Sequence, residues 1–104
     1  MLTGLLSLLP AVPVVASSPA LEAVLREQAG IERALNQLDA VAEQRSTACW
    51  QRFAVNDCLA AVRHETRQQR EPLQAQLLAL RQREREIRLQ LREQRLQDQE
   101  VGRD

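Results

Sequence analysis

Two cysteines, Cys49 and Cys58, lie near the middle of a chain whose other residues mostly favour helix, and their spacing limits how it can fold. Along one continuous helix, a separation of nine residues is about two and a half turns. That would place the two sulfurs on opposite faces, roughly 13 Å apart along the axis. A disulfide needs Cα atoms within about 7 Å of each other. The two cysteines can therefore bond only if the chain reverses between them, which predicts a helical hairpin clipped near its tip.

The composition favours an all-α fold. From residue 20 onward Leu, Ala, Glu, Gln and Arg dominate, as in long helices and coiled coils. Trp50 and Phe53 are the only aromatic residues and β-branched residues are few, which disfavours a β fold. A length of 104 residues allows one small domain. We expect a coiled-coil-like antiparallel hairpin whose first helix occupies residues 17–54 and whose longer second helix occupies residues 55–104.

Residues 1–16 resemble a secretory signal peptide. The segment is apolar and carries no charged side chain, and Val14 to Ala16 supply the small residues that precede a cleavage site. It is shorter than a membrane span of about 20 residues, and Pro10 and Pro13 interrupt it. A basic residue near the start is missing, which indicates either a truncated start or a weak signal. The alternative to a cleaved signal is an uncleaved N-terminal anchor. We expect a periplasmic or secreted protein, since disulfides persist outside the reducing cytosol.

The first helix is predicted from about residue 19 to about residue 52. Ser18 is placed to cap it, Pro19 suits its first position, and Glu22 lies in its first turn. Apolar residues then recur at intervals of three, four and seven. They are Leu21, Val24, Ile31, Leu35, Leu38 and Ala42.

The second helix is predicted to begin at a cap formed by Asn56 or Asp57. One apolar stripe follows it, consisting of Leu59, Val62, Thr66, Leu73, Leu77, Leu80, Ile87 and Leu91. Pro72 removes one backbone hydrogen bond and is expected to kink the helix, because the stripe continues on both sides of it.

Folding the chain about the midpoint of the cysteines predicts which residues face each other. The expected pairs are Leu35 with Leu73, Ile31 with Leu77, Gln28 with Leu80, and Leu21 with Ile87. Residues 88–101 then have no neighbour on the first helix, although they include Leu89, Leu91 and Leu96. Two helices also make a thin core. We therefore expect self-association into a four-helix bundle or docking on another envelope protein.

The cysteine pair has a structural and a redox interpretation. The spacing differs from the two-residue spacing of thioredoxin-like motifs. His64 is the only histidine that could join the cysteines, too few ligands for zinc. We expect a structural clip worth roughly 2.5–3 kcal/mol, and neither a metal nor a cofactor.

The two aromatic residues, Trp50 and Phe53, lie beside this clip. We expect them to cover the disulfide and close the end of the core. The alternative is that they form an exposed anchor for a partner protein, since aromatic residues are frequent at binding hot spots.

An arginine stripe follows one narrow sector of the second helix, formed by Arg81, Arg85, Arg88, Arg92 and Arg95. Like charges at these spacings repel, so acidic partners are expected. Candidates are Glu84 and Glu86 on the same helix, and Glu22, Glu27 and Glu32 on the first helix or on a second subunit. Binding to anionic lipid is an alternative. Nucleic acid is not expected, because the net charge is zero.

The segment from Cys49 to Leu59, CWQRFAVNDCL, followed by a helix rich in Arg, Glu and Gln, resembles small exported proteins of Gram-negative bacteria. In those proteins a Cys-x3-Phe-x-Val-x-Asp-Cys turn precedes a long charged helix. The resemblance covers about residues 45–95. It implies a periplasmic helical protein and supplies no catalytic residues.

These observations lead to three hypotheses about function. The first is a non-enzymatic, periplasmic structural or protein-interaction module. The second is a holdase-like chaperone whose arms clasp unfolded clients, and the third is a thiol-redox protein. The sequence offers no nucleophile with a base, no phosphate-binding loop and no metal-ligand cluster, so we do not expect an enzyme of another kind.

Overall fold

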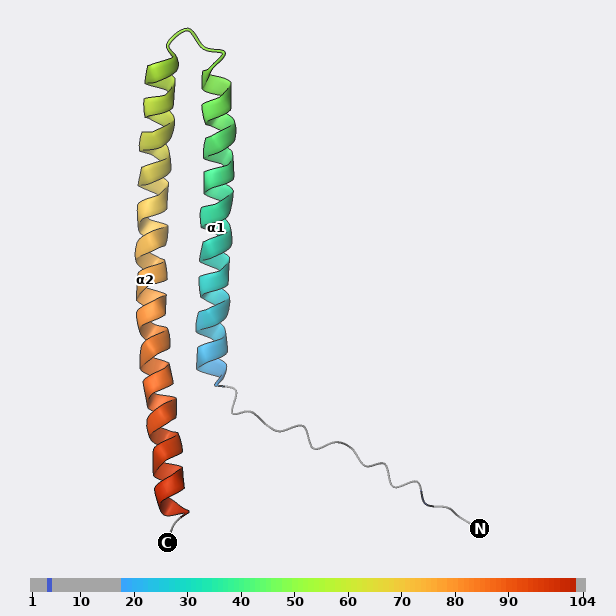
Figure 1. Ribbon diagram of the computed structural model, residues 1–104, viewed down its shortest axis with the longest axis vertical. Helices are drawn as coiled ribbons and strands as arrows, with labels where there is room; N and C mark the ends of the chain where they lie inside the picture. Colours follow the sequence, from blue (N-terminus) through green and yellow to red (C-terminus); the bar gives the residue numbers. More distant parts are fainter. Residues whose placement is uncertain (1–3, 5–17, 103–104) are drawn as a thin grey trace.

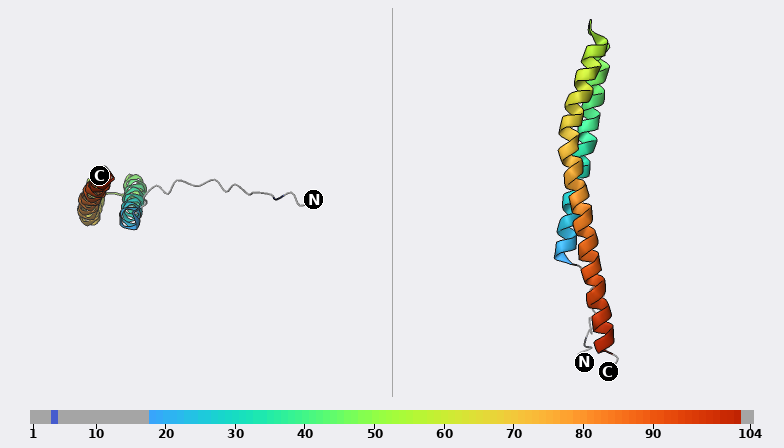
Figure 2. Two further views of the ribbon diagram at one scale, coloured as in Figure 1. Left: turned by 90° about the horizontal axis from the view of Figure 1, so that it is seen from below. Right: turned by 90° about the vertical axis from the view of Figure 1, so that its left-hand side faces the viewer.

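The computed structural model describes Gly4 and residues 18–102, and the described chain forms an antiparallel helical hairpin. Helix α1 spans Pro19–Cys49 and helix α2 spans Val55–Val101. The two helices lie side by side, and α2 extends well past the start of α1 (Figures 1 and 2). At 1.5 Å per residue, the 47 residues of α2 measure about 70 Å and the 31 residues of α1 about 46 Å. The predicted all-α hairpin with a longer second helix is therefore confirmed.

The start of α1 agrees with the sequence prediction. The Ser18 side chain accepts a hydrogen bond of 3.3 Å from the backbone N–H of Leu21, and Pro19 occupies the first turn. Glu22 lies in the same turn, where a negative charge interacts favourably with the helix dipole. The helix ends at Cys49 rather than near residue 52.

The start of α2 differs from the prediction. The helix begins at Val55, so Asn56 and Asp57 lie inside its first turn and neither is the cap. Ala54 occupies the cap position and its side chain can accept no hydrogen bond. The disulfide gives a reason for this early start. The Cα atoms of Cys49 and Cys58 are 5.5 Å apart, so Cys58 must already lie on the first turn of α2 when that turn meets the end of α1.

Helix α2 continues through Pro72 without a break. Proline has no N–H, so the carbonyl of Gln68, four residues earlier, lacks its usual helical donor. Both residues are exposed, and water can bond that carbonyl. The predicted kink at Pro72 stays a prediction.

The core is a single row of side chains between the two helices. Its buried members are Val24, Leu35, Cys49, Val62, Leu77 and Ile87. All other residues of the two predicted stripes are at least half-buried, including the last one, Leu91. The positions predicted for the core are therefore confirmed on both helices.

Charged pairs join the two helices along the edges of this row. Arg45 pairs with Glu65 at 2.6 Å, Asp39 pairs with Arg70, and Glu32 pairs with Arg81 at 3.7 Å. These side chains are largely exposed, and such surface pairs are worth about 0–1 kcal/mol each. They help to align the helices more than they stabilise them.

Leu91 is half-buried, so the prediction that it lies uncovered is wrong. Residues 92–101 of α2 and its C-cap Gly102 are all exposed. Neither α1 nor α2 is both long and apolar enough to cross a membrane. Residues 1–16, which carry the signal-peptide prediction, lie outside the described residues except for Gly4.

Candidate interaction surfaces

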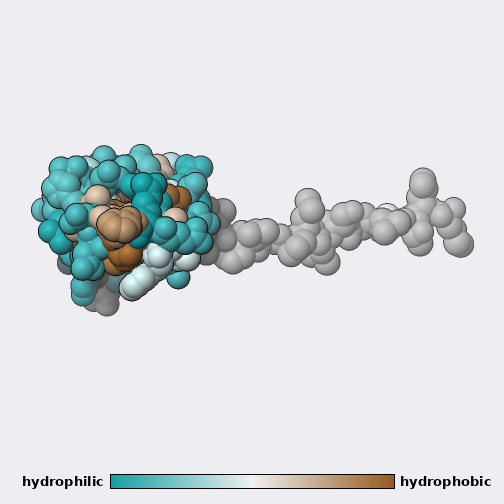
Figure 3. Space-filling view, turned by 90° about the horizontal axis from the view of Figure 1, so that it is seen from above, coloured by the Kyte–Doolittle hydropathy of each residue, from teal (hydrophilic) through white to brown (hydrophobic). Residues whose placement is uncertain are grey.

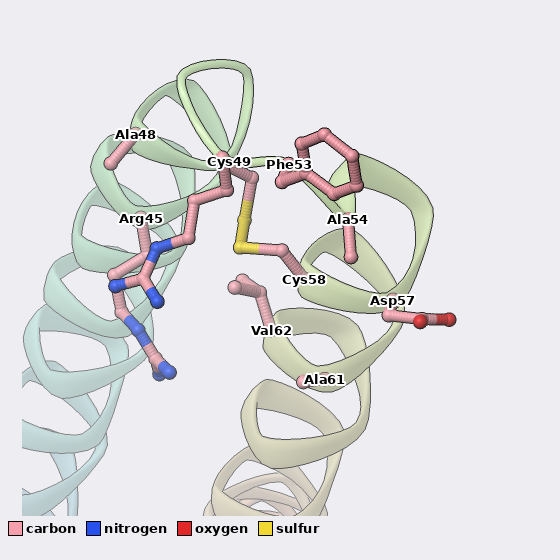
Figure 4. Close-up of a pocket in the computed structure, with 10 residues that line it drawn as sticks. Arg45, Ala48, Cys49, Phe53, Ala54, Asp57, Cys58, Ala61 and Val62 are labelled. Carbon is pink, nitrogen blue, oxygen red and sulfur yellow. A yellow bond between two sulfur atoms is a disulfide. The ribbon is translucent and has the colours of Figure 1, made fainter.

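The tip of the hairpin carries the disulfide and a shallow hollow beside it (Figure 4). Cys49 is completely buried and Cys58 is half-buried. The hollow has a volume of about 620 Å³. Besides the two cysteines, the residues around it are Arg45, Ala48, Arg52, Phe53, Ala54, Asp57, Ala61 and Val62. Seen from above the tip, apolar atoms gather at the centre with a hydrophilic ring around them (Figure 3).

The two aromatic residues are exposed, so the prediction that they cover the disulfide is wrong. Phe53 is fully exposed and Trp50 is 70% exposed. Phe53 lies at the edge of the hollow, with its ring beyond the sulfur atoms (Figure 4). The disulfide holds the helix ends too close together to admit an aromatic ring between them, since the two Cα atoms are 5.5 Å apart. The connecting residues 50–54 therefore pass over the end of the core and present both rings to solvent.

A second apolar feature, which we name the leucine line, lies on the side of α2 that faces away from α1. It consists of Leu78, Leu89 and Leu96, whose exposed fractions are 65%, 59% and 50%. At about 100° per residue, these three positions share a sector of roughly 20°, nearly opposite the core row. Leu89 and Leu96 were predicted as candidate partner-binding residues, and the structure leaves both uncovered.

The arginine stripe is only partly neutralised. Arg88 donates a hydrogen bond from Nε to Glu84 Oε2 at 3.1 Å, and Arg81 pairs with Glu32, as predicted. Among residues 18–102, no acidic side chain lies within ion-pair distance of the remaining three, Arg85, Arg92 and Arg95.

The other expected acidic partners do not serve the arginine stripe. Glu86 pairs instead with Arg83, at 3.6 Å. Glu22 and Glu27 take part in none of the ion pairs of the described chain. Three of the five arginines of the stripe are therefore left without compensation inside the hairpin.

Glu84 connects the stripe to the core. Its Oε1 accepts a hydrogen bond of 3.0 Å from the amide of Gln28, which is the one buried polar side chain of the described chain. The hydrogen bonds from Gln28 and Arg88 lower the pKa of Glu84, while burial opposes them. Gln28 was expected opposite Leu80, and its actual partner lies one turn further along α2. A buried amide with a single matching acceptor favours this alignment of the helices over shifted ones.

Two features of the surface were missed by sequence reasoning. One is a hollow of about 270 Å³ between the helices, bordered by Arg63, Arg67 and Arg70. The other is an acidic row, Glu86, Glu93 and Glu100, on the flank of the leucine line opposite the arginines. Its signal was available, because the three residues recur every seven positions.

His64 is exposed and takes part in no ion pair within the described chain. In residues 18–102, no three His, Cys, Asp or Glu side chains are grouped so that they could hold a metal ion. The chemistry that this surface offers is the burial of apolar side chains and the pairing of charges.

Comparison with family models, with curated proteins and with solved structures finds no match to this chain.

Proposed function

We propose that this protein is a non-enzymatic interaction module of the bacterial cell envelope, a clipped helical hairpin that acts by self-association or by docking on an envelope protein. The observation that carries the proposal is the leucine line. Three leucines stay half or more exposed on a face of α2 that the hairpin itself cannot cover. Aligned apolar side chains on a surface helix are typical of a binding face.

The disulfide supports a location outside the reducing cytosol, because such bonds persist in oxidising compartments. The apolar residues 1–16 and the resemblance of the Cys49–Leu59 segment to exported proteins of Gram-negative bacteria support the same location. A periplasmic site of action is part of the proposal.

The exposed tip favours a second candidate, the holdase-like chaperone. Trp50 and Phe53 present apolar rings beside an open hollow, where an extended client chain could bind. This candidate predicts that the protein suppresses the aggregation of a model client in a light-scattering assay. The interaction module predicts no protection.

The burial of Cys49 argues against the thiol-redox hypothesis. An attacking thiolate must reach a sulfur atom of the disulfide, and one of the two sulfurs belongs to a fully buried residue. We therefore expect slow exchange with glutathione, because only the half-buried Cys58 offers a sulfur within partial reach.

The leucine line can be tested by a paired substitution. We expect the variant L89Q/L96Q to lose both self-association in sedimentation velocity and any partner that the wild type captures from native cell envelopes. The matched control, L25Q/V41Q, removes two other exposed apolar side chains, from α1, and should behave as the wild type. A wild type that is monomeric at every concentration, and that captures the same proteins as L89Q/L96Q, would contradict the proposal.

A further inference from the structure

The outer face of α2 has the organisation of a coiled-coil seam with oppositely charged flanks. Leu89 and Leu96 are seven residues apart, and Arg85 and Arg92 alternate with them at spacings of four and three, as in a heptad repeat. The pattern extends back through the polar Gln82 to Leu78. The outer seam is formed by Leu78, Gln82, Arg85, Leu89, Arg92 and Leu96. All of them are exposed on the described chain.

Two charged rows flank the outer seam, and both repeat every seven residues. The basic row consists of Arg81, Arg88 and Arg95, and the acidic row of Glu86, Glu93 and Glu100. All six side chains are exposed. The basic row occupies the flank that precedes the seam in each heptad, and the acidic row occupies the flank that follows it.

We propose that the outer seam binds a second copy of this chain with the two α2 helices parallel. The inference rests on the self-association included in the proposed function and adds its surface and its orientation. In a parallel pair, each preceding-flank residue meets the partner's following-flank residue five positions later. Arg81 then meets the partner's Glu86, Arg88 the partner's Glu93, and Arg95 the partner's Glu100.

An antiparallel pair has the opposite charge pattern. The two preceding flanks then face each other, as do the two following flanks, so arginine meets arginine and glutamate meets glutamate. Like charges at facing positions are destabilising. The charge rows therefore select the parallel arrangement, which leaves each α1 on the outside of a flat row of four helices.

The outer seam also contains Arg85 and Arg92. In a parallel pair Arg85 lies opposite the partner's Arg85, and Arg92 lies opposite the partner's Arg92, so repulsion between like charges weakens the seam. In the parallel pair each of these side chains enters a hole formed by four residues of the facing helix. That hole includes the acidic residue next in sequence, the partner's Glu86 for Arg85 and the partner's Glu93 for Arg92. The acidic row thus compensates both the basic row and the seam arginines, which Glu32 and Glu84 leave unpaired within the hairpin.

The charged residues near the end of α2 are the best positions for a test, because substitutions there disturb the fewest ion pairs within the hairpin. Arg81, Arg88 and Glu86 are engaged within the hairpin, whereas Arg95, Glu93 and Glu100 have no ion-pair partner among residues 18–102. The acidic row also disfavours an anionic membrane as the occupant of this face, because it places negative charge beside every leucine–arginine pair of the seam.

The experiment uses the full chain with its disulfide intact and follows self-association by sedimentation velocity. We expect E93R/E100R to weaken the dimer at least about tenfold, since arginines then face arginines. Adding R88E/R95E to that variant restores opposite charges across the flanks, with the signs exchanged, and should recover part of the lost affinity. Recovery is partial because Arg92 then has no acidic neighbour in its hole. The matched control E27R/E43R makes the same charge change on exposed positions of α1 and should leave the dimer unchanged. Circular dichroism checks that every variant stays helical.

The orientation is measured with a nitroxide label on Q68C, an exposed position on α2. Parallel neighbours, with axes about 10 Å apart, should place the two labels within about 30 Å of each other. An antiparallel pair over the same seam would separate them by about 60 Å.

Four results would overturn the inference. One is a distance near 60 Å, and another is an exchanged-charge variant that associates no more tightly than E93R/E100R. A dimer that survives E93R/E100R but is lost in L89Q/L96Q would also refute it, while leaving the proposed function intact. A wild type that stays monomeric would refute it too, whether or not the protein binds vesicles of phosphatidylcholine and phosphatidylglycerol. In that case the capture of partners from native cell envelopes still tests the proposed function independently.

Discussion

Removing the disulfide by the substitution Cys58→Ser should lower stability by an amount that the hairpin geometry determines. The bond closes the loop of residues 49–58, and the Cα atoms it joins are 5.5 Å apart. In the chain-entropy model, closing a loop of this length reduces the entropy of the unfolded chain enough to stabilise the fold by about 2.7 kcal/mol at 25 °C. Serine is close to cysteine in size, so the packing around Cys49 changes little.

This free energy corresponds to a large change in melting temperature. With an unfolding entropy of about 2.1 cal/mol/K per residue, the 85 residues from 18 to 102 have about 180 cal/mol/K. A loss of about 2.7 kcal/mol then lowers the melting temperature by about 15 °C. The effect is large because a chain of this size has a small unfolding entropy.

The assay is thermal unfolding followed by circular dichroism, with the wild type and C58S each measured with and without reductant at one protein concentration. We expect C58S to melt below the oxidised wild type, and to match the wild type once the latter is reduced. A61S, which adds a hydroxyl at an exposed neighbouring position, is the control. If C58S were equally destabilised relative to the wild type in reductant, the effect would come from packing, and the reasoning about the clip would be refuted.

Three further substitutions test the packing and the charge network. Gly30→Ala should stabilise α1 by up to about 1 kcal/mol in urea unfolding, because the added methyl group meets only Arg33 Nη2 at 3.8 Å; a destabilised variant would show that the space is not open. Ile87→Ala should cost about 2–3 kcal/mol in the same assay, since Ile87 is only 4% exposed, and a negligible cost would contradict its place in the core. For Glu84→Gln, the lowered pKa of Glu84 predicts a loss of folding stability that depends on pH. The ionised carboxylate stabilises the fold above the ordinary pKa of 4.5, and this contribution disappears as the pH falls through the lowered value. The urea midpoints of the two proteins should therefore differ at neutral pH and converge at about pH 2; a difference independent of pH would count against the network.

The parts of the fold that depend on local chemistry and periodicity were predictable from the sequence. Ser18 and Pro19 define the start of α1, and both apolar stripes face the core as predicted. The reversal between Cys49 and Cys58 followed from helix geometry alone. These features need only the spacing of residues along the chain.

The details of the tip could not be predicted, because the disulfide overrides local preference there. Asn56 and Asp57 are better helix caps than Ala54, yet closure of the bond requires α2 to begin before them. The same closure leaves no room for Trp50 and Phe53 over the core. Which side chains fill the end of a two-helix core depends on the three-dimensional course of residues 50–54.

Pairings between the helices were predictable only in part. Glu32 and Glu84 were expected to compensate arginines, and both do so. The bond from Gln28 to Glu84 was not foreseen, because an alignment that matches apolar residues cannot detect a polar pair one turn away. No acidic side chain of the described chain lies within ion-pair distance of the arginines at positions 85, 92 and 95. Their charges therefore favour a partner outside the hairpin.

The reversal of the chain is most directly tested by small-angle X-ray scattering of the protein from Ser17 onward, in its disulfide form. The measurement is made at a concentration where sedimentation shows monomers. A hairpin whose length is that of α2 should have a longest dimension of about 75 Å. A single unbroken helix over residues 18–102 would measure about 125 Å, and that result would contradict the hairpin and every inference drawn from it.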